Sequence, residues 1–137
     1  MRRSEMTPEL IELSKRAKEL GFPQDVEKGD WIYDDDGDFY LIAYDGLKED
    51  MDILILSFSR CLEWLRGKEY TVRLESRDTD YHKKRGWTAG VTVLKGEEWD
   101  DLPPDFYVHH NAKTHHEAIA KCCVRILEGE KDATVKR

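Results

Sequence analysis

The chain has 137 residues and a formal net charge of −7, and 37% of its residues are charged. This length suits one domain and allows a buried core without disulfides or a metal. No apolar run approaches the ~18 residues of a membrane span, and the first residues lead into a helix pattern without an apolar signal segment. We therefore expect a cytoplasmic protein that forms a single domain over residues 1–137, with an ordered core at about 7–128.

The negative charge is concentrated in one part of the chain. Residues 25–52 hold eleven acidic residues and two lysines, a net charge of −9, whereas the other 109 residues sum to +2. Domains that bind nucleic acids are usually basic. The charge pattern therefore disfavours nucleic acid as a main partner.

The first predicted element is a helix over residues 8–20. Thr7 is its candidate N-cap, and Pro8 suits the first helical position. Gly21 suits the left-handed position that follows the last turn. Apolar residues at spacings of three and four form one stripe along this helix: Leu10, Leu13, Ala17 and Leu20.

Three strands are predicted next, at 31–33, 39–44 and 53–56. The acidic segment 34–38 is typical of a hairpin turn, in which Gly37 takes a positive φ. The strands at 39–44 and 53–56 are apolar at odd and at even positions, and successive side chains of a strand point to opposite faces. We therefore predict that both strands are covered on both faces.

A short helix is predicted at 60–66, with Ser57 or Ser59 as its N-cap and Gly67 at its end. The segments 70–75 and 87–93 alternate between apolar and polar residues. They are predicted to pair as an antiparallel hairpin at the edge of the sheet, through a polar loop at about 78–85. Leu74 is expected to face inward. A loop at 96–104 and a strand at 106–108 follow.

The last predicted helix begins after Thr114, which fits a capping box with Glu117. From 118 to 127 every residue except Lys121 and Arg125 is apolar or cysteine, and a helix of this kind is buried on several sides. We expect it to lie against the sheet, with its second apolar surface covered by another helix or another subunit. Gly129 is predicted to end it, which leaves 130–137 as a flexible tail.

The combined pattern predicts an α+β fold. Strands that are apolar on both faces require cover above and below. We therefore expect an antiparallel β-sheet flanked by helices, in a three-layer α/β/α sandwich. The sequence shows no internal repeat, low-complexity tract or linker to a second domain.

The chain has three cysteines, Cys61, Cys122 and Cys123. Their number is odd, and two of them are adjacent in a predicted helix, where they point in different directions and do not readily form a bridge. We expect reduced thiols that pack as small apolar side chains in the core.

Late histidines are the most conspicuous candidates for a metal site. Zinc or nickel needs three or four ligands that converge on one point, and His110, His115 and His116 are the residues that qualify. His109 and His110 are neighbours in a predicted strand, so at most one of them joins a given site. The alternative, which we favour, is that these are ordinary histidines at the boundary of the core.

Two acidic segments also suggest chemistry. The turn 34–38 resembles a calcium loop, but the first and twelfth positions, where ligands are needed, would be Ile32 and Ala43, so a hairpin turn is favoured. The carboxylates at 97–105 fit a solvated loop better than acid–base catalysis. No motif predicts a catalytic residue or a cofactor. Four aromatic residues are candidates for a binding surface, with core or boundary positions favoured: Trp64, Trp87, Trp99 and Tyr107.

Three segments together resemble a known family. They are residues 28–33 with the turn that follows, residues 61–65, and the Thr-capped helix at 118–127. In this order they resemble small bacteriophage and prophage proteins of unknown function, including those described as having a phage α-β-α sandwich domain. The resemblance covers about residues 7–128, implies a three-layer sandwich and carries no catalytic residues. The charged hairpin at 78–85 departs from the compact versions of the family.

The leading functional hypothesis is a non-enzymatic, phage-derived accessory protein that acts through protein contacts. We expect a homodimer through the last helix or an edge strand, or a complex with another protein, and no membrane partner. One alternative is an acidic binding module that presents residues 25–52 to a basic partner, in the manner of a nucleic-acid decoy. The other alternative is a small metal-binding protein, or a metal-dependent enzyme, that uses the late histidines.

Overall fold

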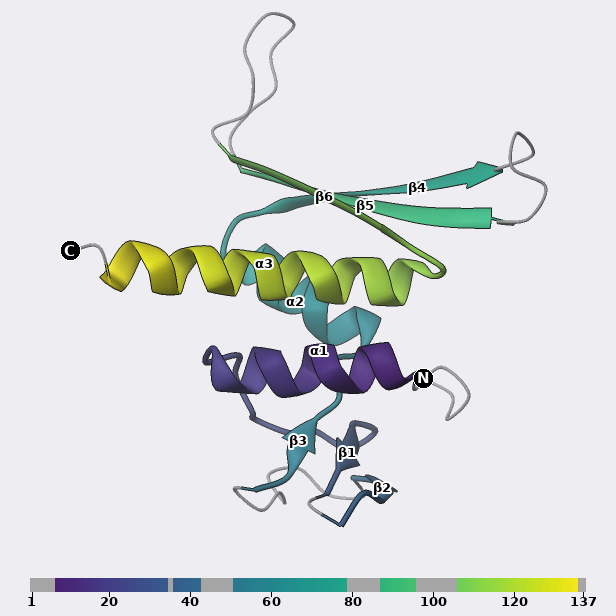
Figure 1. The fold of residues 1–137 in the computed structure, drawn as a ribbon, viewed down its shortest axis with the longest axis vertical. Coiled ribbons are helices and arrows are strands. Elements are labelled where there is room, and N and C mark those ends of the chain that lie inside the picture. Colours follow the sequence, from purple (N-terminus) through teal and green to yellow (C-terminus); the bar gives the residue numbers. More distant parts are fainter. Residues whose placement is uncertain (1–6, 35, 43–50, 79–86, 96–105, 136–137) are drawn as a thin grey trace, which may run out of the picture. The chain divides into compact units, whose positions relative to one another are not determined.

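The computed structural model describes residues 7–34, 36–42, 51–78, 87–95 and 106–135. The chain divides into two compact units, which we describe separately: unit 1 holds residues 1–57 and 127–137, and unit 2 holds residues 58–126. The elements in chain order are α1 (Pro8–Glu19), β1 (Trp31–Tyr33), β2 (Phe39–Leu41), β3 (Ile53–Leu54), α2 (Phe58–Gly67), β4 (Thr71–Asp78), β5 (Trp87–Lys95), β6 (Phe106–Ala112) and α3 (His115–Val135) (Figure 1).

The predicted α+β class is confirmed, because three helices accompany two antiparallel sheets. The expectation of one sheet differs from the structure, in which each sheet has three strands and belongs to one unit. The three-layer sandwich stays a prediction. Among the helices that the structure describes, none is long and apolar enough to cross a membrane.

Helix α1 begins and ends as its sequence predicts. The Thr7 Oγ1 atom accepts a hydrogen bond from the backbone N–H of Leu10 at 3.2 Å. At the other end, Phe22 N donates to the carbonyl of Ala17 at 2.9 Å, and Gly21 has a φ of +98°. This is the Schellman arrangement, in which a residue with positive φ closes the last turn.

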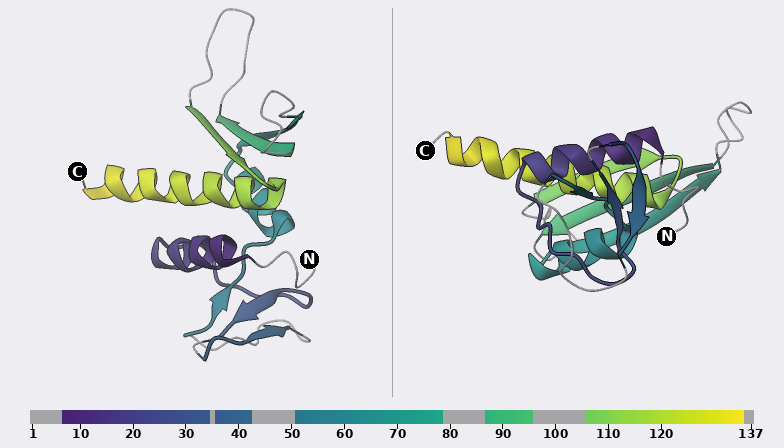
Figure 2. Two further views of the ribbon diagram at one scale, coloured as in Figure 1. Left: turned by 45° about the vertical axis from the view of Figure 1, so that its right-hand side comes forward. Right: turned by 90° about the horizontal axis from the view of Figure 1, so that it is seen from below.

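Ser14 ties α1 to the chain segment that follows β3. This buried hydroxyl donates to the carbonyl of Leu10 at 2.8 Å and accepts from the backbone N–H of Leu56 at 3.0 Å. Lys18 reaches the carbonyl of Asp52 at 2.9 Å. Figure 2 shows the three short strands of unit 1 beside α1. The sequence analysis did not single out Ser14, because a serine on a helix carries no pattern of its own.

The sheet of unit 1 has the strand order β2-β1-β3. The predicted hairpin turn is confirmed: Asp34 N donates to the carbonyl of Asp38 at 2.8 Å, and Gly37 has a φ of +89°. Ile32 in β1 lies opposite Tyr40 in β2 and Leu54 in β3. Ile32 and Leu54 are fully buried, so this face of the sheet belongs to the core.

The other face of this sheet is not covered as predicted. Leu41, which lies on the opposite face from Tyr40, is 53% exposed. The prediction that the strand 39–44 is covered on both faces is therefore wrong at Leu41, and β2 ends there. Residues 43 and 44 lie outside the described residues. Apolar residues at both odd and even positions of a strand show that neither face of the strand is polar. They do not show that other parts of the protein cover both faces.

The sheet of unit 2 has the strand order β4-β5-β6. The predicted antiparallel pairing is confirmed, with Val72 opposite Val93 and Leu74 opposite Val91. Two details were wrong. Strand β5 is central and is buried on both faces between residues 89 and 94, and Leu74 on the edge strand β4 is 51% exposed. Most of the predicted loop at 78–85 and all of the loop at 96–104 lie outside the described residues.

Helix α2 extends the predicted helix by two residues at its start, so that Ser57 directly precedes it. At its end, Tyr70 N donates to the carbonyl of Leu65 at 3.0 Å, and Glu69 N donates to Arg66 at 2.9 Å. The residue in the left-handed position is Glu69, with a φ of +69°. Gly67, which the sequence favoured as the end, is the last helical residue instead.

Helix α3 begins at the predicted cap, where Thr114 Oγ1 accepts from Glu117 N at 3.2 Å. It is buried on most sides, as its composition predicts. The predicted end at Gly129 is wrong, because the helix continues to Val135. One glycine inside a helix costs only about 1 kcal/mol relative to alanine, and no proline follows to stop the helix. Within unit 1, Arg16 Nε lies 3.6 Å from Glu128 Oε1.

Candidate functional site

The four late histidines lie in different environments: His109, His110, His115 and His116. In β6, His109 lies opposite Thr92 and His110 lies opposite Val91, so their side chains are on opposite faces of the sheet. The His109 ring is held at both nitrogens, with Nδ1 2.7 Å from Thr92 Oγ1 and Nε2 3.1 Å from Asn111 Oδ1. In the neutral ring that donates from Nε2, Nδ1 accepts from the threonine hydroxyl.

His115 is occupied by a backbone contact. Its Nε2 atom lies 2.6 Å from the carbonyl oxygen of Glu75 in β4. A carbonyl accepts only, so this nitrogen carries the proton and has no lone pair for a metal. Within the described segments, no three His, Cys, Asp or Glu side chains are placed to hold a metal ion. The structure thus does not bring His110, His115 and His116 together as a ligand set.

The three cysteines are free and buried, as predicted. Burial raises the pKa of the Cys122 thiol to about 12, although a backbone hydrogen bond from His110 opposes this shift. A hydrogen bond with the Cys61 thiol, together with burial, holds the pKa of Cys123 well above its usual range. A thiol reacts as the thiolate, so neither Cys122 nor Cys123 is a nucleophile at neutral pH.

The acidic turn uses its first carboxylate within the turn itself. Asp34 Oδ1 accepts from the backbone N–H groups of Asp36 at 3.0 Å and Asp38 at 2.8 Å. Ile32, which would be the first ligand of a calcium loop, is buried in the core. The turn is therefore built as a hairpin turn. The acidic segment 97–105 lies outside the described residues.

Of the four aromatic candidates, the structure describes the side chain of Trp64 alone. Trp64 is half-buried, and Lys68 Nζ lies 4.9 Å from its ring centroid. Trp99 and the side chains of Trp87 and Tyr107 lie outside the described residues.

An apolar face that the sequence analysis missed lies on the sheet of unit 1. The register places five apolar or aromatic residues on the face opposite the core. None of them is fully buried, and Leu41 is the most exposed at 53%. The rings of Tyr33 and Phe39, which are cross-strand neighbours, have their centroids 5.2 Å apart and are tilted by 59°. We call this set the outer face: Trp31, Tyr33, Phe39, Leu41 and Ile53.

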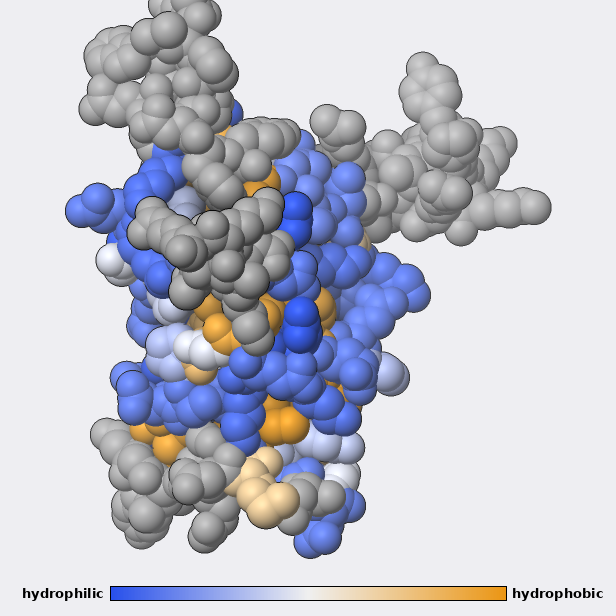
Figure 3. All heavy atoms as spheres, turned by 60° about the vertical axis from the view of Figure 1, so that its left-hand side comes forward, coloured by the Kyte–Doolittle hydropathy of each residue, from blue (hydrophilic) through white to orange (hydrophobic). Residues whose placement is uncertain are grey.

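The outer face belongs to an acidic unit. Unit 1 has 18 acidic and 10 basic residues, a net charge of −8, whereas unit 2 has 11 acidic and 12 basic residues, a net charge of +1. Asp36 and Asp38 in the hairpin turn are exposed. Met51, just before β3, is 69% exposed and adds apolar surface in the same unit. Figure 3 shows how hydrophobic residues reach the surface in small areas among hydrophilic ones on one side of the molecule.

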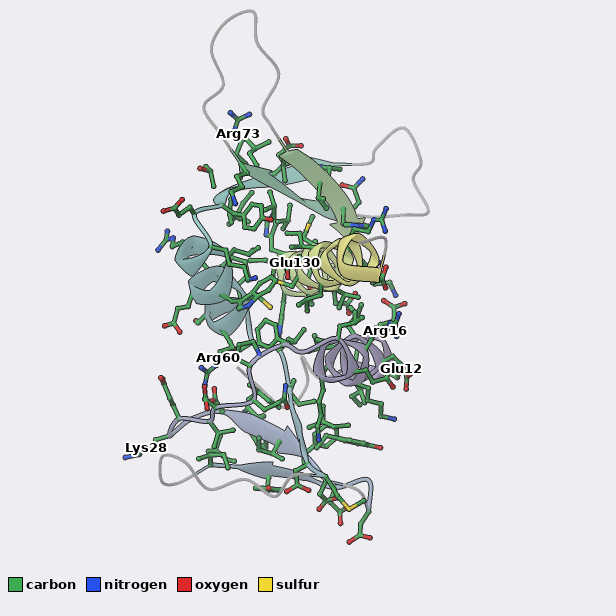
Figure 4. The ribbon with its side chains drawn as sticks, turned by 90° about the vertical axis from the view of Figure 1, so that its left-hand side faces the viewer. Glu12, Arg16, Lys28, Arg60, Arg73 and Glu130 are labelled. Carbon is green, nitrogen blue, oxygen red and sulfur yellow. The ribbon has the colours of Figure 1, made fainter. Side chains whose placement is uncertain are left out.

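The ammonium group of Lys15 on α1 lies over an aromatic ring of the outer face. Lys15 Nζ lies 5.2 Å from the centroid of the Tyr33 ring. The same ammonium group lies 3.4 Å from Glu12 Oε1, one turn earlier in the helix. Figure 4 shows Glu12 on the side of α1 that is turned to solvent. Tyr33 therefore carries a cation over its ring in the absence of any partner.

The sheet of unit 2 presents a second, polar surface. Arg73, Thr92 and His109 form one cross-strand row, and Figure 4 shows Arg73 on the side of the sheet that is turned away from α3. Gly90 lets the neighbouring side chains pack closely, because a Cβ atom there would lie 3.0 Å from Asn111 Oδ1. Hydrogen bonds join Thr92 to His109 and His109 to Asn111, which makes these three residues a structural network.

Comparison of the chain with family models, with curated proteins and with solved structures found no match. The resemblance to phage α-β-α sandwich proteins therefore stays a prediction. The outer face, which lies in the acidic unit, is the strongest candidate site among the described residues.

Proposed function

We propose that this chain is a non-enzymatic accessory protein that acts through protein contacts, and that its outer face binds a basic segment of another protein. One observation carries the proposal: an apolar sheet face, with Leu41 53% exposed, lies in a unit whose net charge is −8. Exposed apolar surface with a polar rim is typical of an interaction site. A phage or prophage origin remains part of the hypothesis.

The chemistry of the face favours a segment that mixes lysine or arginine with aliphatic residues. Their side chains combine a cationic head with an apolar stem, so the stem covers Leu41 while the head stays near carboxylates such as Asp36 and Asp38. Each 100 Å² of apolar surface that becomes buried contributes about 2.5 kcal/mol. The acidic charge of unit 1 accelerates the encounter with a basic segment and gives it specificity.

A second copy of the chain is a poor occupant of the outer face. It would bring another unit with a net charge of −8 against the first, and like charges oppose association. The last helix gives no reason for a dimer either, because its residues 117–120 are buried within a single copy. A homodimer through an edge strand stays a prediction, which light scattering over a range of concentrations tests.

The binding proposal is tested with the full chain and a fluorescein-labelled peptide that alternates lysine and leucine. Fluorescence anisotropy measures the affinity at low salt and at ~0.3 M salt, where the Debye length falls below ~8 Å. We expect saturable binding that weakens with salt. A peptide that alternates lysine and serine and one that alternates glutamate and leucine should both bind at least about tenfold more weakly, since each lacks one of the two components.

The site is tested with two matched leucine variants. Leu41→Ser removes apolar surface from the outer face, and we expect it to weaken the lysine–leucine peptide about tenfold, as removal of 1–2 kcal/mol of apolar contact predicts. Leu74→Ser is the control, because Leu74 is 51% exposed on β4 of the other unit. Equal effects of the two variants, or no binding by the unchanged protein, would contradict the proposal.

A further inference from the structure

The ammonium group of Lys15 already occupies one position on the outer face in the protein alone. Its ammonium group lies over the Tyr33 ring at 5.2 Å from the centroid, a distance at which a cation is attracted to the ring quadrupole. Phe39 in β2 packs beside the same ring, with the two ring centroids 5.2 Å apart. The hydroxyl of Tyr33 lies beside the acidic turn, 3.6 Å from where a Cβ atom of Gly37 would be. The ring is thus held between an aromatic neighbour and the turn, with a cation above it.

We propose that Lys15 occupies a cation-binding position on Tyr33 that a lysine or arginine of the partner takes over on binding. This inference rests on the proposed function, because it assigns the partner's cationic head to a particular ring. The exposed carboxylates of Asp36 and Asp38 flank Gly37 in the turn. They supply the charge that draws a second cation to this end of the outer face.

Lys15 is able to leave the ring without losing an ion partner. Its side chain is 38% exposed, and Glu12, its partner at 3.4 Å, is 74% exposed on the same helix. An exposed cation–π contact and an exposed ion pair are both weak interactions. Rotation of Lys15 toward solvent therefore gives up one weak contact, the one with the Tyr33 ring, while the ion pair with Glu12 on the same helix is kept. The N-cap of α1 and the hydrogen bonds of Ser14 do not involve Lys15, so the helix stays in place.

The exchange makes Lys15 a competitor of the partner, and its removal should strengthen binding. Lys15→Met introduces an apolar side chain of similar length and removes the cation. We expect this variant to bind the lysine–leucine peptide about threefold more tightly, the factor that one exposed cation–π contact represents. Lys28→Met is the matched control, because it makes the same change in charge at an exposed lysine of unit 1 that points away from α1 (Figure 4).

A direct readout separates competition from a general effect of charge. The methylene protons next to the Lys15 ammonium should show a ring-current shift in the NMR spectrum of the free protein and lose it when the lysine–leucine peptide saturates the site. Tyr33→Leu should remove both that shift and the advantage of Lys15→Met. An unchanged Lys15 signal at saturation, or equal gains for Lys15→Met and Lys28→Met, overturns the inference and leaves the proposed function standing. Absence of peptide binding by the unchanged protein overturns both.

Discussion

At the scale of single residues, the C-terminal ends of α1 and α2 both have the Schellman arrangement, but different residues take the left-handed position. Gly21 after α1 has a φ of +98°, whereas Glu69 after α2 has a φ of +69°. A residue with a Cβ atom is strained there by roughly 1 kcal/mol, and glycine is not. The end of α2 therefore stores strain that the end of α1 avoids.

Glu69→Gly should consequently stabilise the protein. We expect the free energy of unfolding to rise by about 0.5–1 kcal/mol, because the relief of the strain exceeds the entropy that a glycine adds to the unfolded chain. Urea unfolding followed by circular dichroism measures the change. Glu69→Ala is the control, since alanine keeps the Cβ atom and should leave the stability nearly unchanged; a gain as large as that of Glu69→Gly would point to the carboxylate instead of the backbone.

The buried thiol of Cys122 predicts a loss of stability in alkali. Its pKa rises from 9.0 to about 12 on folding, so above pH 9 the unfolded chain releases a proton that the folded chain keeps. Unfolding is then favoured increasingly between pH 9 and pH 12, by up to about 1.4 kcal/mol per pH unit. Below pH 9 both states hold the proton and the effect vanishes.

Cys122→Ala removes this contribution. The variant should lose about 1 kcal/mol at neutral pH from the missing atom, and this deficit should shrink above pH 9 and change sign before pH 11, since the unchanged protein loses up to about 1.4 kcal/mol per pH unit. The measurement is the difference in urea-unfolding free energy between the two proteins at each pH, which cancels the titration of groups they share. A constant difference across this range would mean that the folded thiol titrates normally.

At the scale of elements, α3 continues beyond Gly129, although glycine is common at the end of a helix. Gly129 is exposed, has no left-handed φ, and has no atom within 4 Å of the place where a Cβ would lie. Gly129→Ala should therefore raise the free energy of unfolding by about 0.5–1 kcal/mol, because alanine favours the helical state.

Gly21→Ala is the matched control for this element. Its site has the same open space, but its φ is +98°, so the same substitution should destabilise the protein by about 1 kcal/mol. Thermal or urea unfolding of both variants provides the test. Destabilisation by Gly129→Ala would mean that this glycine ends the helix, as the sequence pattern first predicted.

The sequence predicts helix starts and hairpins well, because the determinants are local. Thr7, Thr114 and Gly37 act through atoms a few residues away, and each holds its predicted place. The exposed position of Leu74 and the central position of β5 were not predicted, because strand order depends on pairings between distant segments. Apolar residues at odd and even positions of 39–44 indicated that both faces of this strand are buried. Whether a face is buried depends on which other elements pack against the sheet.

At the scale of the whole molecule, the candidate site follows only in part from the sequence. The acidic segment 25–52 and its basic partner were an alternative hypothesis from charge alone. The outer face needed the register of β1 with β2 and β3, since five residues from three strands meet there. The contact of Lys15 with Tyr33 joins a helix to a strand across 18 positions of the chain, and no short-range pattern signals it.

The difference in charge between the units, −8 against +1, has a practical consequence for any assay that immobilises the protein. An aminated support or an anion-exchange matrix will capture the chain through its acidic half, and in doing so will block the surface under test. Attachment through the amine of Lys113, an exposed lysine of the other unit, leaves the acidic unit out of the linkage. The orientation on the support therefore decides whether a sensor records the partner or the matrix.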